Sequence, residues 1–162
     1  INSINVVRRE GLAEDLLAKG ATVVLIDGPD LASRIAEATG DARVSLAIDA
    51  VGGETFTRMA ESLRFGGTAV SYSALSRQPA SLNMEKAIYN DLRVRTFWLL
   101  KWFETADNAS KQQAMGQVIS LIAQGKLKAD VDSRYALDDI KQAVTRAAAG
   151  GRNGKVLLVP AR

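Results

Sequence analysis

Two adjacent arginines, Arg8 and Arg9, directly follow the short apolar segment Ile4–Val7. An apolar segment of this kind is typical of a buried strand, which places both guanidinium groups at its carboxyl end. Guanidinium groups bind phosphate through forked, charge-assisted hydrogen bonds. In a dinucleotide-binding fold, the end of the second strand meets the adenosine ribose, and arginine there accommodates a 2′-phosphate. If Ile4–Val7 is that strand, the pair predicts NADP(H) rather than NAD(H); the alternative is two solvated surface charges.

The side chains that the sequence lacks restrict its chemistry further. The 162 residues include no cysteine and no histidine, which removes disulfides, thiolate ligands and the commonest general base. We therefore predict no metal site. Proton transfer would need Tyr, Lys, Asp or Glu, or a group outside these residues. Asp49 interrupts an apolar segment, and we expect it to accept hydrogen bonds from loop amides at a strand end.

Composition and charge are those of an ordinary globular chain. Lys and Arg number 21 against 18 Asp and Glu, a net charge of +3, and no basic block indicates nucleic acid. No apolar run approaches the roughly 20 residues that cross a bilayer, and no secretion signal opens the chain. We expect a cytoplasmic protein without a membrane partner, with the mitochondrial matrix as the alternative compartment.

Segments typical of strands alternate with segments typical of helices. The predicted strands are Ile4–Val7, Ala21–Ile26, Val44–Val51, Thr68–Ser73, Val94–Leu100, Val131–Tyr135 and Lys155–Val159. The predicted helices are Leu12–Lys19, Leu31–Thr39, Thr55–Leu63, Met84–Asp91, Ser110–Gln124 and Asp138–Ala149, and residues 64–67 are predicted as a loop. This alternation, with strands apolar on both faces, predicts an α/β fold whose parallel sheet is covered by helices on each side.

One expected element is missing. A dinucleotide-binding fold begins with a strand, a Gly-x-Gly-x-x-Gly turn and a helix, and nothing of this kind precedes Ile4. Either the fold is unrelated, or the chain is a fragment. We favour a truncated Rossmann-like, doubly wound sheet that lacks its first strand, glycine-rich turn and first helix. The missing strand is central in the order 3-2-1-4-5-6, so we expect a companion segment to fill the gap or the strands to re-pair.

Several motifs occur in a characteristic order. They are Ile4–Arg9, Asp49–Gly53, Gly66–Tyr72, Phe97–Leu99 with Trp102, and Gly154–Leu158. Together they resemble the cofactor-binding half of the medium-chain dehydrogenase/reductase family. Within that family the chain is most similar to the NADPH-dependent 2-enoyl thioester reductases of the mitochondrial type, which act in fatty-acid metabolism.

The resemblance implies an activity and a set of contacts. It implies hydride transfer from NADPH to the C=C bond of a 2-enoyl thioester, with the catalytic tyrosine outside this chain, so that the chain alone is expected to be inactive. Alternatives are an NADPH:quinone or enone oxidoreductase of the same family and a non-catalytic NADP-binding module. The cofactor contacts that the resemblance implies are Arg8, Arg9, Val51, Gly52, Tyr72, Ser73, Leu75, Phe97, Trp98, Leu99 and Lys155.

Packing and surface roles compete with some of these assignments. Tyr72 and Trp98 could be packing residues, and Lys155 a surface residue. At Ser73 the family often has glycine. By resemblance, residues 1–128 would form a partial cofactor domain, and residues 129–162 would return to another, catalytic domain. The resemblance also implies a zinc-free enzyme and a homodimer that joins through the outer strand Val94–Leu100.

Overall fold

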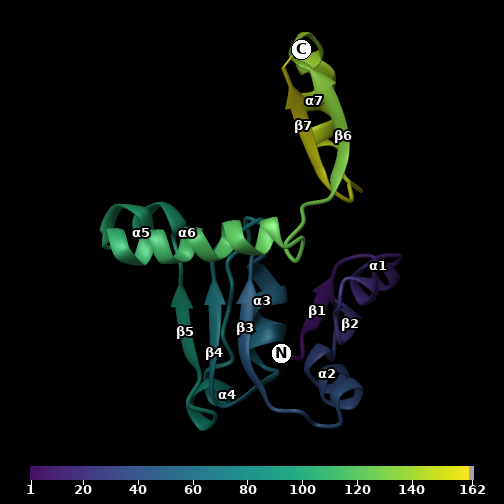
Figure 1. Cartoon of the computed structure of the whole chain (residues 1–162). Coiled ribbons are helices and arrows are strands. Elements are labelled where there is room, and N and C mark those ends of the chain that lie inside the picture. The colour runs from purple at the N-terminus through teal and green to yellow at the C-terminus, as the bar shows by residue number, and fades with distance from the viewer. Residues whose placement is uncertain (161–162) are drawn as a thin grey trace. The chain divides into compact units, whose positions relative to one another are not determined.

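A computed structural model describes residues 1–160 of the chain. It contains two compact units, Ile1–Glu104 and Thr105–Arg162, which we describe separately (Figure 1). The predicted boundary between residues 128 and 129 falls inside the second unit. As an assignment to a cofactor domain and a catalytic domain, that boundary stays a prediction.

The first unit opens with a two-stranded parallel sheet. Strands β1 (Ile4–Val7) and β2 (Val23–Ile26) pair from Ile4 opposite Val23 to Val7 opposite Ile26, and α1 (Ala13–Ala18) connects them. Helix α2 (Leu31–Thr39) follows β2 and ends at Gly40, whose φ of 60° lies in the left-handed region that glycine adopts at little cost.

A three-stranded parallel sheet makes up the rest of the first unit. It consists of β3 (Val44–Asp49), β4 (Leu63–Ser71) and β5 (Arg93–Thr96), in that order. Helix α3 (Gly53–Ala60) connects β3 to β4, α4 (Met84–Tyr89) connects β4 to β5, and α5 (Leu99–Thr105) follows β5. The small core between α3 and this sheet contains Ala47, Phe56, Ala60, Leu63 and Ala69.

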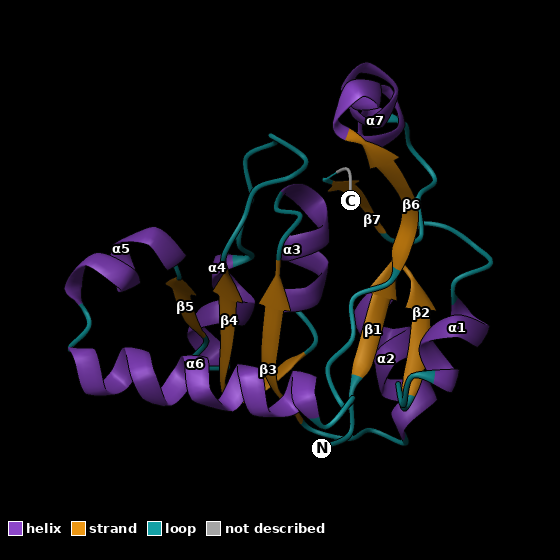
Figure 2. Ribbon diagram, turned by 45° about the horizontal axis from the view of Figure 1, so that its top comes forward, coloured by secondary structure: helices purple, strands orange, loops and turns teal. Residues whose placement is uncertain are grey.

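The two sheets of the first unit do not pair with each other. Both ribbon views show β5, β4, β3, β1 and β2 in one row, with the break between β3 and β1 (Figures 1 and 2). This is a doubly wound strand order with the central strand left out. The predicted α/β fold, a parallel sheet lacking its first strand, is confirmed. The companion segment or strand exchange that we expect at the break stays a prediction.

The second unit begins with the long helix α6 (Asn108–Ala123). A β-α-β unit follows, in which β6 (Val131–Ala136) pairs in parallel with β7 (Lys155–Val159). The short 3-10 helix η1 (Leu137–Asp139) and helix α7 (Ile140–Ala148) connect the two strands. Gly154 is required before β7, because a Cβ atom there would lie 2.6 Å from the backbone nitrogen of Asp132.

Several predicted element ends are shifted, as for the helix predicted at Thr55–Leu63, which ends at Ala60, and two segments differ in kind. The strand predicted at Val94–Leu100 ends at Thr96; Trp98 already accepts a helical hydrogen bond from the Trp102 amide, and Leu99 begins α5. The loop predicted at residues 64–67 is the irregular first part of β4. It stays in the sheet because Gly66 takes a positive φ of 70°, and because the register between β3 and β4 shifts after Val44.

Candidate functional site

Asp49 organises the carboxyl end of β3. Its side chain is buried, with the residue 2% exposed. Oδ1 accepts hydrogen bonds from the amides of Val51 (2.9 Å) and Gly52 (3.0 Å), and Oδ2 accepts one from the Ser71 hydroxyl (2.8 Å). The expectation of a carboxylate bonded to loop amides is confirmed. The same carboxylate also ties the end of β3 to the end of β4.

The turn that follows Asp49 requires its two glycines. Gly52 and Gly53 have φ values of 73° and 58°, which residues with a Cβ atom rarely adopt. The loop after β4 packs closely on the turn: the Ser76 amide donates to the Val51 carbonyl (2.9 Å), and a Cβ on Gly53 would lie 3.2 Å from both Ser76 Oγ and Gln78 Cβ. The glycine pair therefore allows this loop to lie against the first turn of α3.

A cavity of about 440 Å³ opens at the carboxyl ends of β1 and β3, and we call it the polar cavity. Arg8 lines it from the end of β1, and Val51 and Gly52 line it from the end of β3. The remaining lining residues come from α3 and from the loop after β4: Gly53, Glu54, Thr55, Arg58, Ser76, Gln78 and Pro79. In open α/β sheets, ligands bind at the carboxyl ends of the strands, where the strand order reverses.

An ion pair connects the two sheets beside this cavity. Asp27 follows β2, and its carboxylate accepts hydrogen bonds from Arg58 Nε (2.8 Å), Arg58 Nη2 (2.9 Å) and Thr55 Oγ1 (2.5 Å). Burial alone would raise the pKa of Asp27, but the bonds from Arg58 and Thr55 outweigh it and hold the pKa below its ordinary value. The bond to Asp27 in turn raises the pKa of Arg58. The ion pair therefore fixes α3 against the end of β2.

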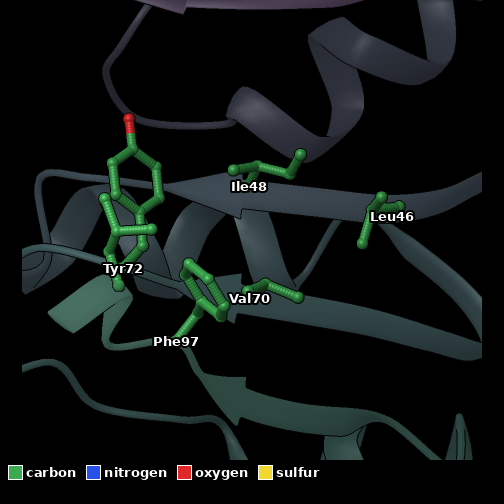
Figure 3. A pocket seen from close by; sticks show the side chains of 6 residues that line it. Leu46, Ile48, Val70, Tyr72 and Phe97 are labelled. Atoms are coloured by element: carbon green, nitrogen blue, oxygen red, sulfur yellow. The ribbon is translucent and has the colours of Figure 1, made fainter. Parts of the chain in front are cut away.

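An apolar surface lies on the face of the β3–β4–β5 sheet opposite α3. Its side chains enclose a hollow of about 390 Å³, and we call the surface the apolar face (Figure 3). Its residues are Leu46, Ile48, Val70, Tyr72, Phe97 and Leu99. Three of them, Tyr72, Phe97 and Leu99, are predicted cofactor contacts.

The structure brings the predicted site residues together in two groups. Arg8, Val51 and Gly52 line the polar cavity, whereas Tyr72, Phe97 and Leu99 line the apolar face.

The other predicted contacts line neither the polar cavity nor the apolar face. Arg9 is exposed beside Arg8. Ser73 and Leu75 lie in the loop after β4, and Trp98 is exposed between β5 and α5. Lys155 is exposed at the start of β7, in the second unit.

Sequence reasoning missed Asp27, Thr55 and Arg58. The i, i+4 spacing of Glu54 and Arg58 on a helix signals an ion pair, and that pair is present at 2.8 Å. No local pattern signals the contact between Asp27 and Arg58, which are 31 residues apart.

The fold and the position of the polar cavity place the chain in the class of α/β proteins in which ligands bind at the carboxyl ends of parallel strands. The family described as zinc-binding dehydrogenase matches residues 19–158, and the chain belongs to this family.

Several named proteins are similar to the chain in sequence or in structure. The chain is 30% identical over 113 residues to the mitochondrial enoyl-[acyl-carrier-protein] reductase of Dictyostelium discoideum, a match that covers 70% of the chain and 32% of the relative. A candidate NADPH:quinone reductase from Bacillus thuringiensis has a similar structure, with a TM-score of 0.80 and 28% sequence identity. The match covers 96% of the chain and 47% of the Bacillus protein. A mutant enoyl thioester reductase from Candida tropicalis has a TM-score of 0.79 and is 25% identical, and the match covers 98% of the chain and 47% of the Candida protein. The chain spans less than half the length of these relatives.

The zinc in the family description finds no suitable ligands among these residues. The sequence has no cysteine or histidine, and residues 1–160 contain no group of three or more acidic side chains that could hold a metal ion. Zinc therefore enters no step of the function proposed below. Over the same residues, no helix is both long and apolar enough to span a membrane.

Proposed function

We propose that the chain is the NADP(H)-binding part of a reductase that transfers hydride to the C=C bond of a 2-enoyl thioester. The observation that carries the proposal is the position of Arg8. It lies at the carboxyl end of β1 and lines a cavity together with the Gly52 turn of β3, where a dinucleotide's adenosine ribose lies in this class of fold. A guanidinium there accommodates the 2′-phosphate that distinguishes NADP from NAD.

The residues fit such a cofactor at both ends. Arg8 and Arg9 would hold the 2′-phosphate, and Val51 and Gly52 would border the adenosine. On the nicotinamide side we propose Tyr72, Ser73, Leu75, Phe97, Trp98 and Leu99. We also propose Lys155 as a contact with the cofactor. The cofactor supplies the hydride, and the apolar face would exclude water from the ring that carries it. We assign no catalytic residue to this chain and propose that it has no activity by itself.

The substrate class rests on the relatives. The names of the Dictyostelium and Candida proteins support an enoyl thioester and a place in fatty-acid metabolism, and the Bacillus protein supports the alternative, a quinone or another enone. Turnover of crotonyl-CoA and of a benzoquinone by the intact protein with NADPH separates these alternatives. We expect crotonyl-CoA to be the better substrate. NADPH consumption with the quinone alone would refute the enoyl assignment, and binding of NADPH without turnover of either would favour a non-catalytic module.

The cofactor assignment is tested by binding rather than turnover. We expect the intact protein to bind NADPH more tightly than NADH. The double variant Arg8→Ala, Arg9→Ala should raise the Kd for NADPH by roughly 100-fold, because two charge-assisted contacts are lost. The Kd for NADH should change little. Equal losses for both cofactors would show that the arginines do not recognise the 2′-phosphate.

The assembly we propose is a homodimer through β5. This strand is the outer edge of its sheet, and all four of its residues, Arg93–Thr96, are exposed. An exposed edge is a template for pairing with a second chain. A proline at Val94 would remove an amide donor from that edge, and light scattering of the intact protein should then show monomers. For the compartment, the name of the Dictyostelium relative, a mitochondrial protein, supports the mitochondrial alternative over the cytoplasm.

A further inference from the structure

Arg58 divides its guanidinium between two acidic residues with very different surroundings. Nε and Nη2 bond to Asp27, whose side chain is 9% exposed. Nη1 bonds to Glu54 Oε2 at 2.8 Å, and the Glu54 side chain is 87% exposed. Both Arg58 and Glu54 line the polar cavity, as Arg8 does. One end of the guanidinium is therefore fixed in the protein, and the other faces the cavity with a solvent-exposed partner.

The two ion pairs differ in how easily they exchange. The pair with Asp27 is partly buried and is supported by the Thr55 hydroxyl, so it persists when a ligand enters. An exposed i, i+4 pair such as Glu54–Arg58 contributes little, because water and salt screen it. A phosphate monoester accepts the same forked, charge-assisted bonds from a guanidinium as a carboxylate does, and it carries about −1.5 to −2 charges near pH 7 instead of one. Phosphate in the cavity can therefore displace Glu54 without disturbing Asp27.

The charges around the cavity favour an anion. Its ionisable lining residues are Arg8, Arg58 and Glu54, two cations against one acid. Gly53 and Glu54 also belong to the first turn of α3, which presents the positive end of the helix dipole. When Glu54 turns outward, both arginines are left to face the ligand from opposite sides of the break in the sheet.

We propose that Arg58 is a second cationic contact for the phosphate bound at Arg8, that Asp27 orients it, and that Glu54 is the group which this phosphate displaces. The inference rests on the proposed NADP(H) site and extends it. Selectivity for the 2′-phosphate then comes from α3 as well as from the end of β1. Glu54 weakens phosphate binding in two ways, by occupying Nη1 and by repelling the ligand.

The first test removes the competing carboxylate and leaves the Asp27 pair intact. In the intact protein, Glu54→Gln should lower the Kd for NADPH by roughly fivefold, since one ion pair and one repulsion are lost, and leave the Kd for NADH within about twofold. The matched control is Glu85→Gln, which makes the same charge change in the first turn of α4, away from the lining of the cavity. It should change neither constant by more than about twofold.

The second test alters the guanidinium itself. Arg58→Lys keeps a positive charge for Asp27 but cannot bond to two partners in one plane. We expect the Kd for NADPH to rise by roughly tenfold and that for NADH to stay nearly unchanged. If this variant does not fold, the surface variant Glu54→Gln still decides the question.

The outcomes separate this inference from the proposed function. If Arg8→Ala, Arg9→Ala removes the preference for NADPH but neither Glu54→Gln nor Arg58→Lys changes it, Arg58 does not contact the phosphate and the NADP(H) site stands. If the unmodified protein binds NADPH and NADH equally, the NADP(H) site and this inference both fail.

Discussion

The polar cavity and the apolar face differ in how their side chains are held. Beside the polar cavity, two acids with little exposure fix groups that line it: Asp49 holds the amides of the Gly52 turn, and Asp27 holds Arg58. On the apolar face the side chains lie on a sheet surface, and Ile48 is 61% exposed. One region is organised before any ligand arrives, while the other is apolar area that is still open to water.

This difference suits the polar cavity to selecting a ligand and the apolar face to burying one. Groups that are already oriented lose little entropy when a ligand binds, so they can distinguish a cofactor that carries the 2′-phosphate from one that lacks it. The apolar face gains free energy only when something covers it, at about 25 cal/mol per Å², and exposed apolar patches of this kind mark binding surfaces. Substitutions of the acids and glycines that hold the polar cavity in shape should therefore destabilise the chain, whereas substitutions on the apolar face should act mainly on binding.

The largest effect is expected at Asp49. Asp49→Ala leaves the Val51 and Gly52 amides without their side-chain acceptor and leaves the Ser71 hydroxyl only the Ser73 carbonyl as acceptor, so the free energy of unfolding should fall by about 3 kcal/mol. Asp49→Asn should restore most of it, because the amide oxygen accepts from Val51 and Gly52 and the amide nitrogen donates to Ser71 Oγ. Urea denaturation of the intact protein measures both. A fall of less than about 0.5 kcal/mol for the alanine variant, the range of ordinary surface changes, would show that Asp49 does not organise the cavity.

The next effect concerns the glycine turn. Gly53→Ala introduces a Cβ at a positive φ and within 3.2 Å of Ser76 and Gln78, and should cost about 2 kcal/mol. The matched control is Gly116→Ala in the middle of α6, where a Cβ would meet nothing within 4 Å and should stabilise the helix by about 0.5–1 kcal/mol. Equal effects at the two positions would mean that the loop after β4 does not constrain the turn.

The sequence predicted those parts of the molecule that depend on local pattern. The strand β3 and the bonding of Asp49 both follow from an apolar run that ends in a polar residue. The end of β5 did not follow, because the apolar run from Phe97 to Leu100 fits a strand and a helix equally well.

The Asp27–Arg58 pair was out of reach of the sequence for another reason. Its partners meet only when α3 packs beside the end of β2, and no local pattern encodes that contact. Of the polar cavity, the sequence therefore predicted Arg8, Val51 and Gly52, whereas the position of Arg58 depends on tertiary packing.

A smaller effect should appear as a dependence on pH. The pKa of Asp27 is lower in the folded chain than its ordinary value of 3.8, so the unfolded chain binds the proton more tightly. The ion pair therefore stabilises fully above that value, and this contribution is lost as the pH falls through the lower folded pKa. Asp27→Asn should be about 1 kcal/mol less stable than the unmodified protein near neutral pH. Acid titration of both proteins, monitored by circular dichroism, should show that the difference in stability between them shrinks as the pH falls below 3.8. A difference in stability that does not depend on pH would exclude a charged pair.

The smallest change in stability is expected on the apolar face, and it distinguishes the two regions most directly. Ile48 already contacts water in the folded chain, so Ile48→Ser should change the free energy of unfolding by less than about 0.5 kcal/mol. The same substitution makes the face that we propose for the nicotinamide side more polar, and should therefore weaken binding of NADPH and NADH equally, because it does not touch the phosphate. A shift in the NADPH to NADH ratio would mean that the two regions are coupled. A stability loss as large as that of Asp49→Ala would mean that the apolar face is part of the folded core and not a surface for ligand.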